Sequence, residues 1–204
     1  MKTVNNKITI IGSIASELEY SHDVYNEVFY QFTILSDRLS DNKDVLPVVM
    51  SERVIGKNTL TVGTPIRVYG QIRSYNHYDS AINRNRLVLT VFAHRIEDAG
   101  AAQHINEVFL DCYICKPLVY RETPFGREIC DLHVAVNRGY GKSDYIPCIA
   151  WGRTARFANT LDVGNNVKLR GRMQSREYQK RQGDGSVDER IAYEVSIGKL
   201  EVEQ

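Results

Sequence analysis

The sequence lacks several features that mark whole classes of protein. No hydrophobic run approaches the roughly 20 residues of a membrane-spanning helix, and the first residues show no secretory signal. The five histidines include no pair four residues apart that could hold a metal. No G-x-S-x-G motif, phosphate-cradling glycine loop or cluster of carboxylates is present. These absences predict a cytoplasmic protein without membrane segments, and they give no support to an enzyme or to a bound cofactor.

Cysteine is also scarce, and the four cysteines all lie in the second half of the chain. Cys112 and Cys115 form a C-x-x-C motif, but it falls in an alternating, strand-like run, and Cys130 and Cys148 form no second pair. Residues three apart on a strand point to opposite faces. We therefore expect buried thiols that pack as small apolar side chains, rather than a metal or redox site.

Net charge is nearly absent, at +1, but its distribution is uneven. Residues 165–181 contain six basic side chains and a single acid, Glu177. Such a local excess suits a surface that follows phosphates, although charge alone favours a solvated strand face. The basic residues are Lys168, Arg170, Arg172, Arg176, Lys180 and Arg181.

An internal repeat with a step of about 100 residues organises the chain. The segment 32–38 matches 132–138, and 44–50 matches 144–150, both at an offset of 100. The glycine-bounded segment 62–70 then matches 163–171 at an offset of 101. A period this long indicates two whole domains rather than a solenoid. We expect domains at residues 1–98 and 106–204, joined by a short linker of small residues at 99–105.

Hydrophobic alternation predicts five strands in each half. In the second half they fall at 106–115, 128–136, 144–151, 166–175 and 190–197, with one or two helical turns at 152–161. The first half repeats the pattern at 7–14, 29–35, 45–50, 65–73 and 87–93. Five strands with one short helix between the third and fourth is the order of an OB-fold, a small Greek-key barrel. The predicted fold is therefore all-β, with two tandem OB-folds.

Two runs of the second half carry a resemblance to a known family. Residues 145–155 read YIPCIAWGRTA, and residues 161–178 read LDVGNNVKLRGRMQSREY. Together they resemble bacterial and phage single-stranded DNA-binding proteins over nearly all of residues 106–197, and residues 6–97 match more loosely. The resemblance implies binding of single-stranded DNA without sequence preference, in replication, recombination or repair at the nucleoid.

Aromatic and basic residues interleave in the second half, as a binder of single strands requires. Bases stack on aromatic rings, with roughly 1–3 kcal/mol per base, beside a cationic groove. The predicted stacking residues are Tyr140, Tyr145, Trp151 and Tyr178, at or near the positions that the family uses. Further predicted phosphate contacts are Arg138, Lys142 and Arg153, besides the six clustered cations. Tyr145 and Trp151 share one strand face, which could be core or surface; the flanking cations favour a binding surface.

The first copy differs at the equivalent positions. Val45, Ser51 and Ser40 stand where the second copy has Tyr145, Trp151 and Tyr140, and charges up to Asp98 balance at 11 basic and 11 acidic. We therefore expect the second barrel to bind while the first binds weakly or serves assembly. Family members with one barrel per chain assemble four, so a homodimer with four barrels is expected.

Other functions remain open on the sequence. An OB-fold protein can act mainly through protein contacts, as a primosome or recombination mediator, and stacking alone does not distinguish RNA from DNA. Typical family members continue into a tail with an acidic tip that recruits partners. This sequence stops at Glu201-Val-Glu-Gln204 after its last strand, so we expect no recruitment through such a tail.

Overall fold

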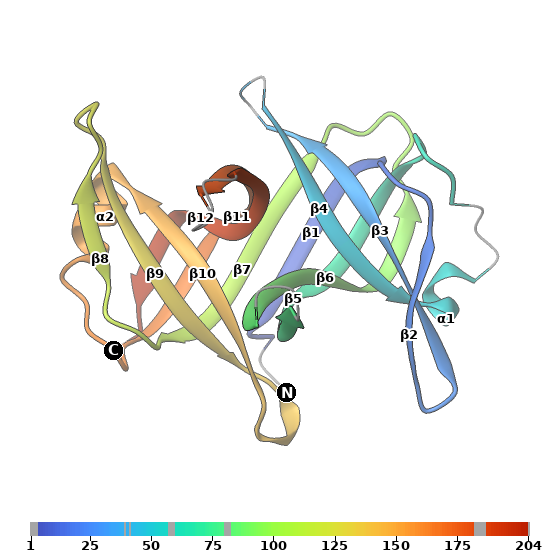
Figure 1. Cartoon of the computed structure of the whole chain (residues 1–204), viewed down its shortest axis with the longest axis horizontal. Coiled ribbons are helices and arrows are strands. Elements are labelled where there is room, and N and C mark those ends of the chain that lie inside the picture. Colours follow the sequence, from blue (N-terminus) through green and yellow to red (C-terminus); the bar gives the residue numbers. More distant parts are fainter. Residues whose placement is uncertain are drawn as a thin grey trace.

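The computed structural model describes residues 4–38, 40, 42–56, 60–79, 83–181 and 187–203. They form two barrels that stand side by side (Figure 1). The first contains β1 (Asn6–Ile14), β2 (Glu19–Val24), β3 (Glu27–Asp37), β4 (Lys43–Ser51), α1 (Glu52–Ile55), β5 (Pro65–Asp79) and β6 (Arg84–Asp98). The second contains β7 (Ile105–Ile114), β8 (Val119–Glu122), β9 (Glu128–Asn137), the 3-10 turn Gly139–Gly141, β10 (Ser143–Trp151), α2 (Gly152–Ala158), β11 (Asn166–Arg181) and β12 (Val187–Val202).

Each half has the strand pairing of an OB-fold. In the second barrel β7 pairs antiparallel with β9 and β11, and β10 pairs parallel with β12. The first barrel repeats these pairings, including the parallel pair of β4 and β6. The predicted all-β fold of two tandem OB-folds is thus confirmed. No helix in the described part of the chain is long and apolar enough to cross a membrane.

Each barrel has one short strand more than the five expected. β2 and β8 are the first strands of hairpins that turn into β3 and β9. Hydrophobic alternation did not reveal them, because β8 is exposed along its whole length and β2 along nearly all of it. A strand without a buried face carries no period-2 signal.

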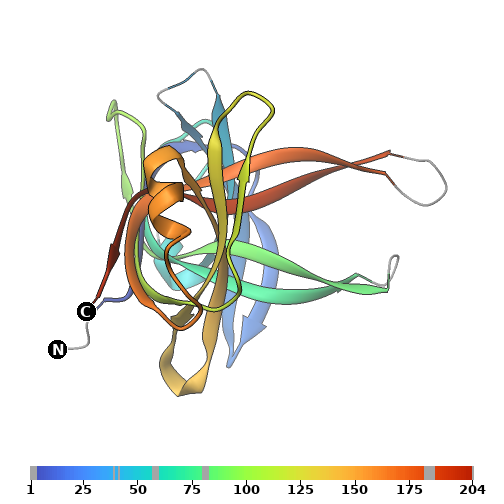
Figure 2. The same cartoon turned by 90° about the vertical axis from the view of Figure 1, so that its left-hand side faces the viewer.

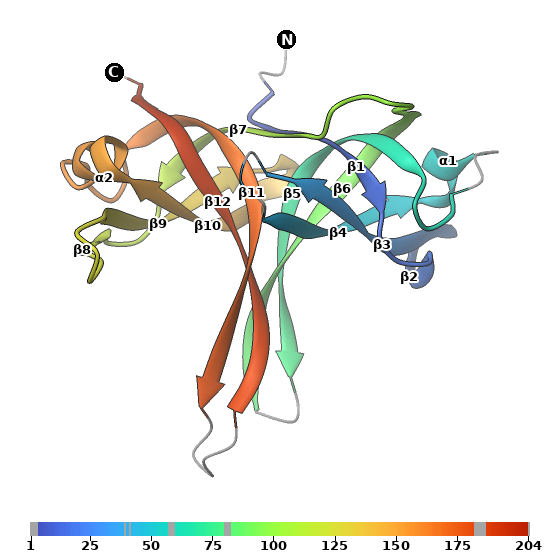
Figure 3. The ribbon, with the colours of Figure 1, turned by 90° about the horizontal axis from the view of Figure 1, so that it is seen from above.

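Two long β-hairpins project from the barrels to the same side (Figure 2). We call β5–β6 the first arm and β11–β12 the second arm; seen from above, they run close together (Figure 3). The predicted strand 166–175 continues to Arg181, and the predicted strand 65–73 continues to Asp79. The ladder holds these extensions, with Tyr178 opposite Arg190 and His77 opposite Arg86. The alternation of apolar and polar residues ends before the strands do, because a hairpin that projects into solvent needs no buried face.

A glycine marks where each arm leaves its barrel. A Cβ at Gly171 would collide with the backbone carbonyl of Ser196, and one at Gly70 would meet that of Phe92. Strand pairing also shifts register at Arg170/Gly171 and at Tyr69/Gly70. Such bulges bend a strand and increase its twist. Only glycine allows the close backbone approach that starts each arm.

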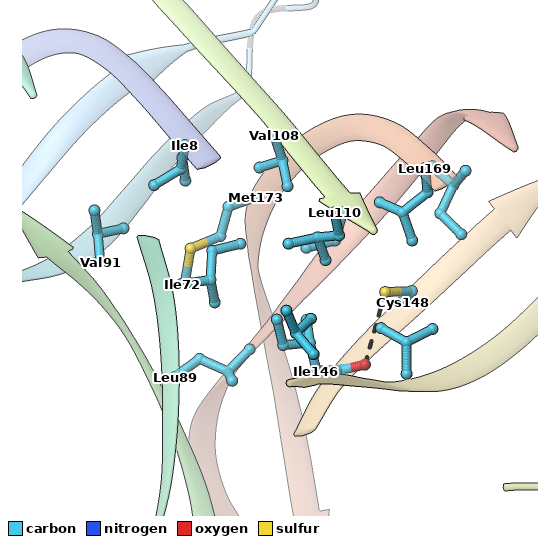
Figure 4. Close-up of a cluster of buried hydrophobic side chains, with 14 of the residues drawn as sticks. Ile8, Ile72, Leu89, Val91, Val108, Leu110, Ile146, Cys148, Leu169 and Met173 are labelled. Carbon is cyan, nitrogen blue, oxygen red and sulfur yellow. Dashed lines mark hydrogen bonds between the residues drawn. The ribbon is translucent and has the colours of Figure 1, made fainter. Parts of the chain in front are cut away.

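The barrels are joined far more tightly than by the segment between Asp98 and Ile105. β1 pairs antiparallel with β7, so that all twelve strands form one continuous sheet. Ile8 lies opposite Val108, its own equivalent in the repeat, which places a local two-fold relation between the barrels. Buried side chains of both halves form one cluster, in which Ile72 and Met173 lie near the boundary (Figure 4). The two repeats therefore share their core.

Candidate nucleic-acid interface

The outer face of β10 carries two of the predicted stacking residues. Ile146, Cys148 and Ala150 point into the core, whereas Tyr145 and Trp151 point outward, with 51% and 41% of their surfaces exposed. The strand alternates in this way because successive side chains lie on opposite faces. Trp151 is therefore a surface residue, and the core interpretation that the pattern left open does not hold.

Trp151 borders a hollow of about 400 Å³, which we call the Trp151 groove. Its floor is apolar, from Ile129 and Ile149, and Arg121, Arg172 and Arg176 stand around it. The full lining is Arg38, Arg121, Thr123, Ile129, Ile149, Trp151, Arg172, Gln174, Ser175, Arg176 and Glu194. An aromatic platform with an apolar floor and several guanidinium groups suits a base and its phosphates.

The four arginines of the Trp151 groove are balanced to different degrees. Arg121 pairs with Asp131 at 2.8 Å, and Arg176 lies 3.7 Å from the carboxylate of Glu194. Arg172 donates a hydrogen bond to Gln174 and has no ion pair within the described part of the chain. Burial lowers the pKa of Arg172, and the charge of Arg38 lowers it further, against the opposing effect of Asp44. A partly desolvated cation without a carboxylate partner attracts an anion strongly.

Tyr178 lies at a different place, on the second arm. It borders a hollow of about 270 Å³ between the two arms, together with Arg86, Leu87, Leu89, Pro147, Arg190, Ile191, Ala192 and Tyr193. The guanidinium of Arg176 lies 5.9 Å from the Tyr178 ring centre, within cation–π range. The first arm therefore contributes apolar side chains beside Tyr178, a predicted stacking residue of the second barrel. Sequence reasoning missed this contribution because the arms approach each other only in the folded chain.

Several other predicted site residues lie outside both hollows. Tyr140 and Lys142 are exposed in the loop between β9 and β10, and Arg153 is exposed in the first turn of α2. Arg138 turns toward Asp144, with Nε 3.4 Å from Oδ2. These four residues could contact a bound DNA strand only where that strand extends past the Trp151 groove.

The basic cluster of 165–181 divides into two groups. Arg172 and Arg176 line the Trp151 groove, whereas Lys168 pairs with Glu203 at 2.6 Å and Arg170 covers the Phe109 ring at 5.1 Å. Neither Lys168 nor Arg170 lines either hollow. Lys180 and Arg181 lie in β11, but their side chains fall outside the described residues.

Two residues that sequence reasoning did not single out extend the surface. Phe125, at the tip of the β8–β9 hairpin, is 92% exposed, and Arg121 lies in β8 at the edge of the Trp151 groove. Residues 123–126 read Thr-Pro-Phe-Gly, which is typical of a turn, so an aromatic side chain at its tip was the available signal. Arg121 carried no signal, since β8 shows no alternation.

Each arm is anchored to the opposite barrel by one buried aspartate, the second arm by Asp44 and the first arm by Asp144. Asp44 is 1% and Asp144 0% exposed. Asp44 accepts hydrogen bonds from Arg38 and from the backbone N–H of Ser175 at 2.9 Å. Asp144 accepts from Arg73 at 2.9 Å and from the backbone N–H of Ser74 at 2.8 Å. Charge-assisted bonds in a buried site fix geometry strongly, so the arms and the grooves beside them have defined positions.

The serine hydroxyls complete this arrangement. The Ser74 hydroxyl accepts from the backbone N–H of Tyr145 at 2.7 Å, and that of Ser175 accepts from Val45 at 3.2 Å. Tyr145 is therefore held by a residue of the first arm. The two sets correspond to each other in the repeat, because Asp44 and Asp144 are 100 residues apart and Ser74 and Ser175 are 101 apart.

The first barrel fills its equivalent of the Trp151 groove with its own side chains. His22 stacks on Phe29 with ring centres 4.9 Å apart, and the rings of Phe29 and Phe92 lie tilted to each other with centres 5.8 Å apart. Ser51, at the position of Trp151, donates a hydrogen bond to the carboxylate of Glu27. A carboxylate and an internal aromatic stack replace the open platform of the second barrel.

The cysteines are free and mostly buried. Cys112, Cys130 and Cys148 lie in the core, and burial raises the pKa of Cys112 to about 12. Cys115, just after β7, is half-buried, with Sγ 3.3 Å from the carbonyl oxygen of His133. Within the described residues no three His, Cys, Asp or Glu side chains gather to hold a metal.

Comparison with known proteins finds matches to the second barrel. Residues 105–202 match the model of the single-strand binding protein family. Single-stranded DNA-binding protein A of Bacillus subtilis (strain 168) is 35% identical over 86 residues, which cover 39% of this chain and 50% of that protein. Single-stranded DNA-binding protein 1 of Staphylococcus aureus (strain COL) is 34% identical over 86 residues, covering 39% and 52%. The chain thus spans about half the length of these relatives.

A solved structure extends the likeness of fold to the whole chain. The wild-type single-stranded DNA binding protein from Thermus aquaticus superposes with a TM-score of 0.76 at 18% identity, over 98% of this chain and 93% of that one. Both barrels and their arrangement thus have a counterpart of known structure. Residues 105–202 thus match the single-strand binding protein family, and the whole chain has a fold of two OB-folds in tandem.

Proposed function

We propose that the chain binds and protects single-stranded DNA without sequence preference, mainly through its second barrel, during replication, recombination or repair at the nucleoid. The family consists of non-enzymatic DNA-binding proteins. The observation that carries the proposal is the exposed Trp151, above an apolar floor and ringed by arginines of β8, β11 and the first barrel. A base can stack on the indole while guanidinium groups contact its phosphates.

The surfaces of the second barrel support binding that does not read sequence. Stacking on Trp151, Tyr145 and Tyr178 accepts any base, because every base has a π-face. Tyr140, Phe125 and Lys142 lie in exposed loops, where they could contact a strand that extends past the groove. We assign the first barrel a supporting role, since its equivalent site is filled by His22, Phe29 and Phe92.

Salt dependence tests this function. Each phosphate neutralised on a single strand contributes about −0.7 to the slope of log K against log salt. If three or four arginines of the Trp151 groove engage phosphates, the slope for oligo(dT) should be about −2 to −3. Fluorescence anisotropy of labelled oligomers over a salt series measures it. A slope near zero would contradict the proposal, and competition with oligo(rU) shows whether ribose is accepted.

We also propose that two chains associate, so that four OB-folds act together. A closed two-fold pair is the commonest form of homo-oligomer. Light scattering should then give about twice the 23.3 kDa of one chain. A mass of one chain that does not change with dilution would rule out the homodimer.

A further inference from the structure

A third hollow, larger than the Trp151 groove and the hollow between the arms, lies at the junction of the two barrels. This junction cavity has a volume of about 770 Å³. It is bounded by the end of β3, by the segment that joins the barrels and by the start of the second arm. Its lining is Asp37, Arg38, Ser40, Asp44, Ala102, Gln103, His104, Asn106 and Arg172. None of the predicted stacking residues borders it.

Arg38 and Arg172 line both the Trp151 groove and the junction cavity. The two hollows therefore meet at a pair of guanidinium groups, one from each barrel. The groups are close enough that the charge of Arg38 contributes to the lowered pKa of Arg172. Asp44 pairs with Arg38, but Arg172 has no ion pair of its own among the described residues, so the two guanidinium groups form a favourable place for a phosphate.

The hydrogen bonds of Arg38 leave one edge of its guanidinium open. Nε donates to Asp44 at 2.9 Å, and Nη2 donates to Asp44 at 2.6 Å and to the carbonyl of Ser175 at 2.9 Å. A guanidinium has five donors, and both donors of Nη1 lack an acceptor among the residues that the structure describes. The side chain is only 16% exposed, so the open edge is fixed in place.

The acids of the junction cavity oppose an anion only weakly. Both oxygens of Asp44 are taken by Arg38 and Ser175. Asp37 is half exposed at the rim, where the amine of Lys43 lies 3.5 Å away. Exposed charges are screened by water and salt. The passage between the arginines thus stays favourable for a phosphate.

The other side of the local two-fold is arranged differently. The equivalent of Arg172 in the first arm is Gln71, at the repeat offset of 101. The neighbouring Arg73 is held by Asp144 at 2.9 Å and lies 5.9 Å from the Phe92 ring centre. On that side Arg73 and Arg138 both lie at the carboxylate of Asp144, at 2.9 and 3.4 Å, whereas Arg172 has no ion pair among the described residues.

We propose that a strand bound in the Trp151 groove passes between Arg38 and Arg172 and continues into the junction cavity, so that the first barrel contributes a phosphate contact to the binding site of the second. This inference rests on the proposed binding of single-stranded DNA. It gives the first barrel a direct part in binding even though its own platform is filled. This contribution of the first barrel depends on the length of the DNA, because a short oligomer can bind in the Trp151 groove without reaching the junction cavity.

Oligomers of two lengths and two charge-adding variants test the path. Gln103→Glu places a carboxylate at the junction cavity. Asn159→Asp adds the same charge just after α2, where it lines neither the junction cavity nor the Trp151 groove. Site sizes of about 4–16 nucleotides per OB-fold suggest oligo(dT) of about 4 and about 16 nucleotides. Gln103→Glu should weaken the longer oligomer by roughly two- to fivefold, the size of an exposed charge effect. It should leave the shorter oligomer unchanged, and Asn159→Asp should change neither.

Arg172→Gln provides a second test, with Arg53→Gln on α1 as its control. Loss of the Arg172 charge should make the salt slope shallower by about 0.7 for the longer oligomer, and Arg53→Gln should not change it. If Gln103→Glu and Asn159→Asp act alike on the longer oligomer, or if Arg172→Gln keeps the full slope, the path is wrong while the proposed function stands. If the unmodified chain binds neither oligomer, both the path and the function fail.

Discussion

Replacement of Asp144 by alanine is expected to lower the free energy of unfolding by about 3–5 kcal/mol, because it removes one partner of a buried ion pair. Asp144 is fully buried and accepts bonds from Arg73 and from the backbone of Ser74. Its loss leaves the Arg73 guanidinium without a counter-charge and removes the acceptor of the Ser74 backbone N–H in the first arm. Denaturant unfolding followed by circular dichroism measures the change.

The control is an aspartate in a surface pair. Asp131 pairs with Arg121 at 2.8 Å, and both side chains are partly exposed. Asp131→Ala should cost at most about 1 kcal/mol, as exposed ion pairs do. If Asp144→Ala cost no more than this control, the two aspartates would not anchor the arms.

Trp151→Ala should weaken binding of oligo(dT) by about 1–3 kcal/mol, the contribution of one stacked base. Because the Trp151 side chain is 41% exposed, its stability cost should stay below the roughly 3–5 kcal/mol of a buried aromatic. Tyr178→Ala should weaken binding by a similar amount. Anisotropy titrations and thermal melts of the same preparations separate the two effects.

Tyr113 offers a matched control for these variants. It is an aromatic of β7 with 44% of its surface exposed, and it lines neither the Trp151 groove nor the hollow between the arms. Tyr113→Ala should leave affinity unchanged. Equal losses for Trp151→Ala and Tyr113→Ala would mean that stacking on Trp151 does not drive binding. A fall in melting temperature of Trp151→Ala as large as for a core aromatic would also contradict its surface role.

Much of the fold could be predicted because the core strands alternate. In β10, Ile146, Cys148 and Ala150 are buried while Tyr145 and Trp151 are exposed, and the period-2 pattern reports this directly. Strands without a buried face gave no such signal. Backbone hydrogen bonds hold the arms beyond Ser175 and Arg73 and the short strand β8, and every residue type except proline can donate such bonds.

Part of the candidate site could also be predicted from the sequence. Residue type and spacing pointed to Trp151, Arg172 and Arg176, which the structure brings together in one groove. They did not show that Lys168 and Arg170 are engaged elsewhere, because charge along a strand carries no information on its partners. Arg38 lies 134 positions before Arg172, and only the pairing of the barrels brings them to one wall.

The joining of the barrels left only a partial signal in the sequence. The repeat predicted two domains, and the equivalence of Asp44 with Asp144 was visible in it. A buried aspartate at the same place in both copies suggests a shared structural role, but its partners Ser74 and Ser175 come from the opposite arm. Contacts between repeats cannot be read from either repeat alone.

Emission of Trp151 during titration with oligo(dT) tests the central claim most directly, since this is the only tryptophan in the chain. Stacking of a base on the indole should quench the emission in a saturable way, and the midpoint should move to higher DNA concentration as salt rises. The Trp151 groove lies open to solvent, so no rearrangement needs to precede the change. If anisotropy shows the oligomer bound while the emission stays unchanged, single-stranded DNA does not bind at the Trp151 groove.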